Sequence, residues 1–260
     1  MIDLHSHVLF GIDDGPATRE ASLALARDAV AAGTRTIVAT PHVSTRYRND
    51  VATIAAAADE LTAMLREEDS PLRLIAGAEV ALARVHELEP DELAGLCLGD
   101  GGWLLLEPPF GASAPDLEPA AEQLQSRGHR IVLAHPERCP LFYRDIGLLE
   151  RLVRNGALSS VTAGSLTGSF GGAARSFALQ LAEAGLVHNV ASDTHDQSAR
   201  PPEIATHLRR AGLAGLSDWL TEEVPAAILA GGEIPRRPDQ SISTSRRRTV
   251  LSRLRGRPTR

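Results

Sequence analysis

The chain of 260 residues contains no lysine, because all 27 of its basic residues are arginines. Walker-type nucleotide binding, Schiff-base catalysis and protein-kinase phosphoryl transfer each require a lysine, so these three mechanisms are excluded. Cysteine is nearly as scarce: Cys97 and Cys139 supply no disulfide framework and fit a reducing compartment. Aromatic residues make up 3% of the chain and hydrophobic residues 43%, so we expect a core of Ala, Leu, Val and Ile.

Long hydrophobic runs are missing as well. No stretch of about 18 or more apolar residues occurs, so no membrane span is expected. The N-terminus lacks the pattern of a signal peptide, which together with the cysteine usage predicts a cytoplasmic protein. The length suits one large domain, which we place at residues 1–235 and follow with a tail over residues 236–260.

The net charge of −6 hides a strong asymmetry. Residues 236–260 hold nine arginines and one acidic residue, so the body of the chain carries a net −14. A tail of this composition is expected to be disordered; its functional alternative is weak contact with an anionic membrane or an acidic partner. The acidic body argues against a nucleic-acid partner, because such affinity comes largely from cationic contacts with phosphates.

Short apolar runs alternate with helical patterns along the chain. Runs that are apolar throughout predict parallel strands buried on both faces. The predicted strands are 2–7, 36–40, 72–81, 103–106, 131–134, 158–162 and 187–191, and the predicted helices are 19–32, 50–68, 116–127, 146–154, 172–185, 202–213 and 218–230. Seven such units predict an α/β fold with a closed TIM-like barrel, and an open doubly wound sheet is the alternative.

Histidines and carboxylates recur at the ends of these predicted strands. His5 and His7 alternate on the first strand and therefore point to one face. For this pair alone, an ordinary edge strand is the simpler interpretation. The same chemistry repeats at later strands, on the third strand at Glu79 and after other strands at His42, Glu107, His135, Asp193 and His195. Because the carboxyl ends of parallel barrel strands converge on one face, we expect one shared site there.

The number of these side chains predicts a cluster of ions. They are too many for one tetrahedral zinc, and they suit two or three divalent ions bridged by carboxylates. In the turn after the first strand, Asp14 is a better ligand candidate than Asp13, which is expected to shape the turn. Asp3 is placed to hydrogen-bond a ligand imidazole. Glu79 is a bridging ligand or a buried hydrogen-bond partner, and Glu107 is a ligand or such a partner.

The order and spacing of these motifs resemble the polymerase-and-histidinol-phosphatase (PHP) superfamily. The resemblance rests on His5-Ser-His7 to Asp14, Thr40-Pro-His42, Gly77-x-Glu79, His135-Pro-Glu-Arg138 and Ser192-Asp193-x-His195. Within that superfamily, residues 1–235 are similar to the bacterial CpsB/YwqE tyrosine-protein phosphatases, which are linked to capsule and exopolysaccharide synthesis. That similarity rests on Gly11-Ile-Asp-Asp-Gly15-Pro16, Ala39-Thr-Pro-His42, Ala134-His-Pro-Glu-Arg138, Gly168-Ser-Phe-Gly171 and Arg200-Pro-Pro202.

The resemblance implies a distorted seven-stranded barrel and a manganese-preferring cluster, with iron, zinc, cobalt or magnesium as alternatives. It implies hydrolysis of phosphotyrosine, and a membrane-associated bacterial tyrosine kinase as the phosphorylated partner. The implied metal ligands are His5, His7, Asp14, His42, Glu79, Glu107, His135, Asp193 and His195. Phe10 and Val43 depart from the family pattern; we expect them to alter the mouth of the site without removing a ligand.

The expected chemistry is direct attack on phosphorus by hydroxide that the divalent ions generate. Arg138 is expected to stabilise the phosphoryl oxygens, with a surface ion pair as the alternative. Arg200 is a second phosphate contact or only shapes the turn before two prolines. Together with Arg138, His42 and Asp193 are the expected catalytic residues. A cysteine mechanism is rejected, because Cys139 stands in a C-x4-R arrangement where thiolate phosphatases use C-x5-R.

Other candidates and other functions stay open at this stage. Three side chains are candidates to stack on a substrate ring, or belong to the core or surface: Tyr47, Phe142 and Tyr143. Four histidines lie outside the strand ends and are expected to be structural: His86, His129, His188 and His207. Histidinol-phosphate hydrolysis would use the same cluster, phosphodiester cleavage is disfavoured by the acidic body, and a purely structural metal module is disfavoured by the complete ligand set.

Overall fold

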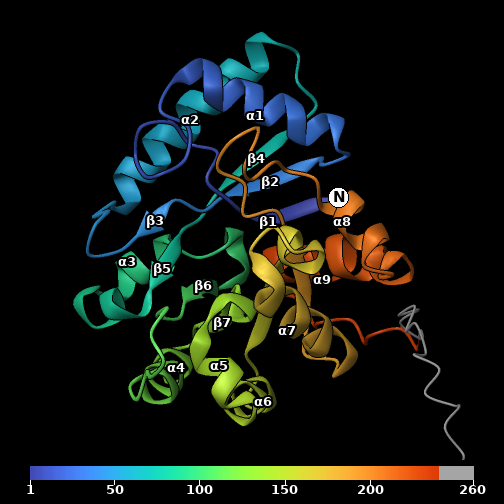
Figure 1. Ribbon diagram of the computed structural model, residues 1–260. Helices are drawn as coiled ribbons and strands as arrows, with labels where there is room; N and C mark the ends of the chain where they lie inside the picture. Colours follow the sequence, from blue (N-terminus) through green and yellow to red (C-terminus); the bar gives the residue numbers. More distant parts are fainter. Residues whose placement is uncertain (240–260) are drawn as a thin grey trace, which may run out of the picture.

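The computed structural model describes residues 1–239 and forms an α/β fold in which all the paired strands run parallel (Figure 1). One sheet has three strands in the order β1-β2-β4, and the other has six in the order β3-β5-β6-β7-β8-β9. The strands are β1 (Ile2–Ser6), β2 (Thr36–Ala39), β3 (His42–Val43), β4 (Arg73–Ala76), β5 (Glu79–Ala81), β6 (Trp103–Glu107), β7 (Arg130–Ala134), β8 (Leu158–Thr162) and β9 (Asn189–Ala191).

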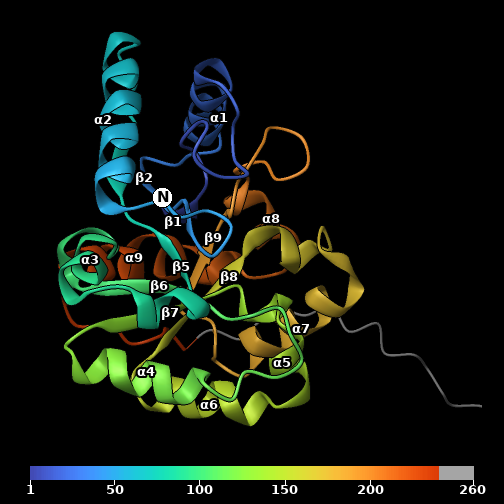
Figure 2. The ribbon, with the colours of Figure 1, turned by 90° about the vertical axis from the view of Figure 1, so that its left-hand side faces the viewer.

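Helices surround these strands in both views of the ribbon (Figures 1 and 2). They are α1 (Arg19–Ala31), α2 (Val51–Glu67), α3 (Pro90–Gly95), α4 (Leu117–Ser126), α5 (Pro140–Arg144), α6 (Ile146–Arg154), α7 (Gly171–Glu183), α8 (Ile204–Arg210) and α9 (Val224–Ala230). All seven predicted helices are confirmed; in the last of them, a π-helical turn over Trp219–Glu223 precedes α9. The short helices α3 and α5 were not predicted. None of the helices in residues 1–239 is long and apolar enough to cross a membrane.

Two further strands interrupt the predicted order. After the second predicted strand the chain passes Pro41 and forms the short strand β3, and the third predicted strand is broken at Gly77 into β4 and β5. Proline cannot donate to a strand ladder. A Cβ on Gly77 would lie only 3.1 Å from Val38 Cγ1, so the chain passes close to its neighbours there. Each break carries the chain from the three-stranded sheet into the six-stranded one, so nine strands stand where seven were expected.

The first strand of one sheet lies beside the last strand of the other. His7 N donates to Thr194 O at 2.9 Å, and Asp193 N donates to His5 O at 2.9 Å. These bonds connect the end of β1 to the segment that follows β9. The carboxyl ends of strands from both sheets therefore meet in one place, as the sequence predicted for a parallel arrangement.

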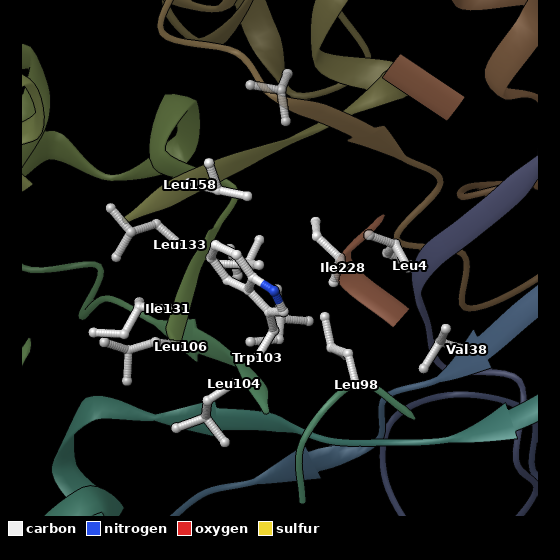
Figure 3. Close-up of a cluster of buried hydrophobic side chains, with 14 of the residues drawn as sticks. Leu4, Val38, Leu98, Trp103, Leu104, Leu106, Ile131, Leu133, Leu158 and Ile228 are labelled. Carbon is white, nitrogen blue, oxygen red and sulfur yellow. The ribbon is translucent and has the colours of Figure 1, made fainter. Parts of the chain in front are cut away.

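The core at the other end of the strands is built around Trp103 (Figure 3). The aliphatic side chains drawn around it come from both sheets, as Leu4 and Leu133 do, from α9, as Ile228 does, and from the segment before β6, as Leu98 does. At Gly101 a Cβ would lie 1.8 Å from Ile228 O, so only glycine permits α9 to approach this closely. The core thus consists largely of aliphatic residues, as the composition predicted.

The residues on both sides of the expected domain boundary contact the domain. Trp219 Nε1 donates to Pro235 O at 2.9 Å, and Arg237 Nη2 donates to Ala182 O at 2.9 Å, at the end of α7. The described structure therefore reaches past residue 235, where the domain boundary was expected. Residues 240–260, and with them most of the predicted basic tail, lie outside the described residues.

Candidate metal centre

The nine predicted ligand positions come together at the carboxyl ends of the strands. The side chains form four overlapping groups, and within each group the ligand atoms lie within 4.8 Å of one another. The groups are His7, Asp14, His42 and His195; His5, His7 and Asp193; His5, Glu79 and His135; and His42, Glu79 and Glu107. Because several side chains belong to two groups, the arrangement fits neighbouring ions that share bridging ligands better than it fits one isolated ion.

Glu79 occupies the middle of this arrangement. Its Oε1 lies 2.7 Å from His135 Nε2, and its Oε2 lies 3.0 Å from His42 Nδ1 and 3.3 Å from His5 Nε2. Oε2 is buried, yet it accepts no hydrogen bond of good geometry from residues 1–239. Burial opposes the charge on Glu79, but the nearby imidazoles hold the pKa of its carboxyl well below the usual range. A charged carboxylate surrounded by imidazole nitrogens fits a bridging ligand.

Glu107 approaches the same centre less closely. Its Oε2 lies 4.0 Å from His42 Nδ1, and its Oε1 lies 3.9 Å from His135 Nε2. Burial, together with repulsion from the carboxylate of Glu79, raises the pKa of Glu107 to about 7. Glu107 therefore lies within the group, farther from the imidazoles than Glu79.

Asp13 fixes two of the candidate ligands. Its Oδ2 lies 2.7 Å from His7 Nδ1 and accepts a hydrogen bond from the backbone N–H of His42 at 3.1 Å. Its Oδ1 accepts from Gly15 N at 2.9 Å, where a Cβ would lie 2.3 Å from His7 O. Burial opposes charge on His7, but its bonds to Asp13 and Glu79 raise the pKa of the ring to about 10. Asp13 thus shapes the turn, as predicted, and also orients an imidazole.

Asp14 lies at the open side of the centre. Its Oδ1 is 3.4 Å from His42 Nε2 and 3.3 Å from His195 Nε2. The hydrogen bond from His195 keeps the pKa of the Asp14 carboxyl well below its usual range. Asp14 therefore faces the rings of two candidate ligands, His42 and His195.

The expectation for Asp3 was wrong. Its carboxylate does not reach an imidazole; it accepts hydrogen bonds from the backbone N–H of His5 at 3.3 Å and from Ser192 N at 3.0 Å and Ser192 Oγ at 2.5 Å. A buried carboxylate needs such donors to offset its desolvation. Asp3 therefore ties β1 to the segment after β9 and supports the site through the backbone.

His135 and Asp193 adopt a backbone conformation that residues other than glycine rarely adopt. Their φ values are 31° and 52°, in the left-handed region. Strained backbone of this kind persists where the surrounding structure determines it, and it gathers at functional sites. Burial and the nearby Arg138 lower the pKa of His135 to about 4, so its ring is neutral and suited to binding a metal.

Two arginines border the centre. Arg138 Nη1 donates to Asp193 Oδ2, and Arg200 Nη1 lies 3.0 Å from His195 Nε2. Both guanidinium groups lie over the ring of Phe170, with Cζ at 4.4 Å and 5.5 Å from its centroid. Arg138 is therefore not a surface ion pair, because its side chain is 13% exposed and faces a candidate ligand.

The three aromatic candidates lie in different surroundings. Phe142 is fully buried and belongs to the core, and Tyr143 packs edge-on against Phe177. Tyr47 stacks on His42 with 5.8 Å between ring centroids. The ring of Phe110 stacks on His135, with 5.4 Å between centroids, and was missed. Its signal in the sequence was its position three residues after Glu107, at the end of a strand.

The two departures from the family pattern have different surroundings. Val43 is fully buried in β3 and pairs with Val80, so the expectation that it alters the mouth of the site was wrong. Phe10 is partly exposed in the loop before α1, where the guanidinium of Arg19 lies 5.5 Å from its centroid. Val43, the residue that follows His42, is therefore part of the hydrophobic core in this chain.

Glu137 is a buried residue of the site that sequence reasoning did not single out. Its Oε1 accepts hydrogen bonds from Thr162 N at 3.0 Å and from Ser165 Oγ at 2.7 Å. Burial raises the pKa of its carboxyl to about 7. These bonds anchor the turn between His135 and Arg138 to the end of β8, so Glu137 sets the position of both neighbours.

The two thiols are not suited to act as nucleophiles. Cys139 Sγ contacts the backbone oxygens of His135 at 3.7 Å and Pro108 at 3.9 Å. Burial raises the pKa of this thiol strongly, and it raises the pKa of Cys97 to about 11. A thiol that stays protonated is a poor nucleophile, which agrees with the rejection of a cysteine mechanism.

The residues present fit divalent ions. His5 Nε2 and His7 Nε2 lie 3.2 Å apart, so two imidazole nitrogens point at one region of space. Imidazoles mixed with carboxylates suit manganese, iron, zinc and similar ions. The donor chemistry and the convergence of the four groups both match a cluster of such ions.

Comparison with known proteins agrees with this geometry. The family model "Capsular polysaccharide synthesis, CpsB/CapC" matches residues 1–212. The chain is 40% identical to tyrosine-protein phosphatase YwqE of Bacillus subtilis over 245 residues, 93% of this chain and 96% of the relative. It is 30% identical to tyrosine-protein phosphatase CpsB of Streptococcus pneumoniae over 210 residues, 78% of this chain and 86% of the relative.

A solved structure gives the same result in three dimensions. It comes from a study of YwqE from Bacillus subtilis and CpsB from Streptococcus pneumoniae, described as metal-dependent tyrosine phosphatases. It superposes with a TM-score of 0.80 at 35% identity, covering 94% of this chain and all of that one. The family model and the relatives each span most of the chain. The protein therefore belongs to the CpsB/CapC family of capsular polysaccharide synthesis proteins.

Proposed function

We propose that this protein is a metal-dependent tyrosine-protein phosphatase. The observation that carries the proposal is the convergence of nine imidazole and carboxylate side chains beside two arginines, at the carboxyl ends of parallel strands. The relatives named as tyrosine-protein phosphatases support it, because they cover nearly the whole chain. A cluster of divalent ions with flanking cations suits the hydrolysis of a phosphomonoester.

The proposal has finer features. The proposed ligands are the nine side chains of the four groups, which would hold two or three ions. Manganese is proposed as the native metal, because the family resemblance implies it. Residues 1–235 form the catalytic domain, and the two sheets act as one distorted seven-stranded barrel. Support for the barrel comes from the backbone bonds between the end of β1 and the segment after β9. The unpaired, buried cysteines support a cytoplasmic location.

Each residue has a proposed task in the reaction. Bound divalent ions lower the pKa of a coordinated water toward about 7, so a nucleophile is available at neutral pH. Arg138 and Arg200 bind the phosphoryl oxygens and stabilise the charge that develops on them. Asp193 orients Arg138 through their hydrogen bond. His42 is proposed to act at the open side of the centre, near the leaving phenolate, which needs less help from a proton donor than an alkoxide.

The proposed substrate is a phosphotyrosine protein of the capsule or exopolysaccharide system, specifically an autophosphorylated, membrane-associated tyrosine kinase. The description of the family as capsular polysaccharide synthesis proteins supports this assignment. The arginine-rich tail is proposed to contact anionic membrane near that kinase, because each basic residue near such a surface contributes about 1 kcal/mol.

Metal removal tests the proposed function. Protein stripped by a chelator is expected to lose hydrolysis of a phosphotyrosine peptide and to regain it with manganese, in proportion to the bound metal measured by elemental analysis. Histidinol phosphate serves as the competing substrate, because the same cluster suits it. Full activity of metal-free protein would refute the metal mechanism, and a higher kcat/KM on histidinol phosphate would refute the protein-phosphatase assignment.

A further inference from the structure

Phe110 presents an exposed ring beside the candidate metal centre. It lies in the loop after β6, where the ring stacks on the imidazole of His135, tilted by 19°. The guanidinium carbon of Arg138 lies 5.5 Å from the Phe110 centroid. In spite of these contacts the residue is 50% exposed. Leaving apolar area in water forgoes the free energy of burial, so this ring has surface available for an apolar ligand group.

The other rings at the site are engaged differently. Phe170 has the guanidinium groups of both Arg138 and Arg200 over its ring, and it is more buried than Phe110. Tyr47 is partly buried, with its ring stacked on His42 and the guanidinium of Arg46 at 4.9 Å from its centroid. Phe110 is thus the ring that combines exposure with closeness to Arg138.

We propose that Phe110 is a specificity-determining residue, whose ring packs against the phenyl ring of a tyrosyl phosphate substrate. The inference rests on the phosphatase function proposed above and identifies the side chain that contacts the aromatic ring of the substrate. A single ester oxygen joins phosphorus to that phenyl ring. A phosphoryl group bound at Arg138 therefore places the substrate ring next to Phe110. Offset or edge-to-face aromatic contacts of this kind add to the free energy of simple burial.

A different role for the same ring makes different predictions. Phe110 covers the imidazole of His135, which is itself buried, and the alternative role of the ring is to keep water from that candidate metal ligand. If the ring only excluded water, its loss would change the affinity for every molecule that binds at the centre equally, because the effect would pass through the metal. A ring contact acts only on ligands that carry an aromatic group. The two roles are therefore separated by comparing ligands that share one anionic head.

The test uses the full-length, manganese-loaded protein and two phosphonates that cannot be hydrolysed. Calorimetric titration measures the affinity for benzylphosphonate and for methylphosphonate in the wild type and in Phe110→Ala, Phe110→Leu and Phe110→Tyr. We expect Phe110→Ala to weaken benzylphosphonate about three- to tenfold and to leave methylphosphonate and the manganese content unchanged. Phe110→Tyr keeps the ring and is expected to keep the preference, and Phe110→Leu is expected to fall between.

Tyr47→Leu is the matched control, because Tyr47 also stacks on a candidate ligand. It is expected to preserve the preference for benzylphosphonate over methylphosphonate. Equal weakening of both phosphonates in Phe110→Ala, loss of manganese from that variant, or loss of the preference in Tyr47→Leu alone would overturn the proposal. The affinity ratio decides the ring contact even for a protein that fails to hydrolyse phosphotyrosine peptide, so it is judged separately from the proposed function.

Discussion

Histidines at the two ends of the strands differ in what their ring nitrogens face. At the carboxyl ends of the strands, the rings of His5, His7 and His135 face one another and the carboxylate of Glu79. His188, just before β9 at the other end, accepts a hydrogen bond on Nδ1 from the backbone N–H of Ser159 at 3.2 Å. The first set converges on a shared space, whereas His188 bonds only to the chain around it.

The pKa does not separate His135 from His188. Burial, with Arg138 nearby, lowers the pKa of His135 to about 4, and burial, with Arg237 nearby, lowers the pKa of His188 to about 4 as well. Both rings are therefore neutral near pH 7. The partner of the ring nitrogen is the informative feature, because a nitrogen aimed at other ligands can bind an ion and one satisfied by the backbone cannot.

Replacement of His135 gives the largest expected effect. His135→Ala removes a proposed ligand, so bound manganese and turnover should fall together, by at least about the hundredfold that loss of a ligand's hydrogen-bond partner can cost. His188→Gln is the matched control and should keep metal content and turnover. Metal analysis beside phosphotyrosine-peptide kinetics checks both. The comparison fails if the two variants lose metal to the same extent.

His188 should instead control the pH dependence of stability. Its pKa is about 4 in the folded chain, below the ordinary 6.5, so the unfolded chain binds a proton that the folded chain does not. Stability is then lost as pH falls from about 6.5 toward about 4, by up to about 3 kcal/mol. Urea unfolding at several pH values should show a shallower loss in His188→Gln than in the wild type. Parallel pH profiles would contradict this assignment.

Arg138→Ala should separate phosphate binding from metal binding. The variant loses one charge-assisted contact of about 1.5–3 kcal/mol, which lowers kcat/KM about ten- to over a hundredfold. Metal content is expected to stay near that of the wild type, unlike in His135→Ala. Arg138→Lys keeps the charge without the planar geometry and should recover part of the rate. Poor metal binding or unchanged kinetics in Arg138→Ala would show that the residue has another role.

Arg200→Ala should have the smallest effect. The side chain of Arg200 is 31% exposed and lies beside the ring of His195, so water screens its charge more than that of Arg138. A contact of this kind is worth about 0.2–1 kcal/mol, and kcat/KM is expected to fall about two- to fivefold. Steady-state kinetics on the same peptide measures it. A loss as large as that of Arg138→Ala would place both arginines equally close to the phosphate.

The positions of the candidate ligands were predictable because they follow from strand ends. A buried parallel strand reveals itself as an apolar run, and the first polar residue after the run marks its carboxyl end, as at His42 and His135. The divided strands were less predictable. Nothing in the apolar pattern of 72–81 reveals that Gly77 passes close to Val38 and that the chain changes sheet there.

The supporting residues were hidden because their contacts are distant in sequence. Asp3 pairs with Ser192, and Glu137 pairs with Thr162 and Ser165, across neighbouring strands. Asp13 was recognised as a turn residue, but its bond to His7 depends on how the turn folds back over the strand. Such partners follow from the three-dimensional path of the chain and not from local spacing.

The burial of Cys139 affects how sensitive the protein is to oxidation. Peroxide oxidises thiolates, and the readily oxidised thiols are those with a low pKa and access to solvent. The Cys139 thiol is fully buried, and its pKa is raised, one residue after the arginine proposed to bind phosphate. A phosphatase built this way keeps its sulfur out of the reaction. It would continue to dephosphorylate tyrosine under oxidative stress that silences enzymes whose nucleophile is a thiolate.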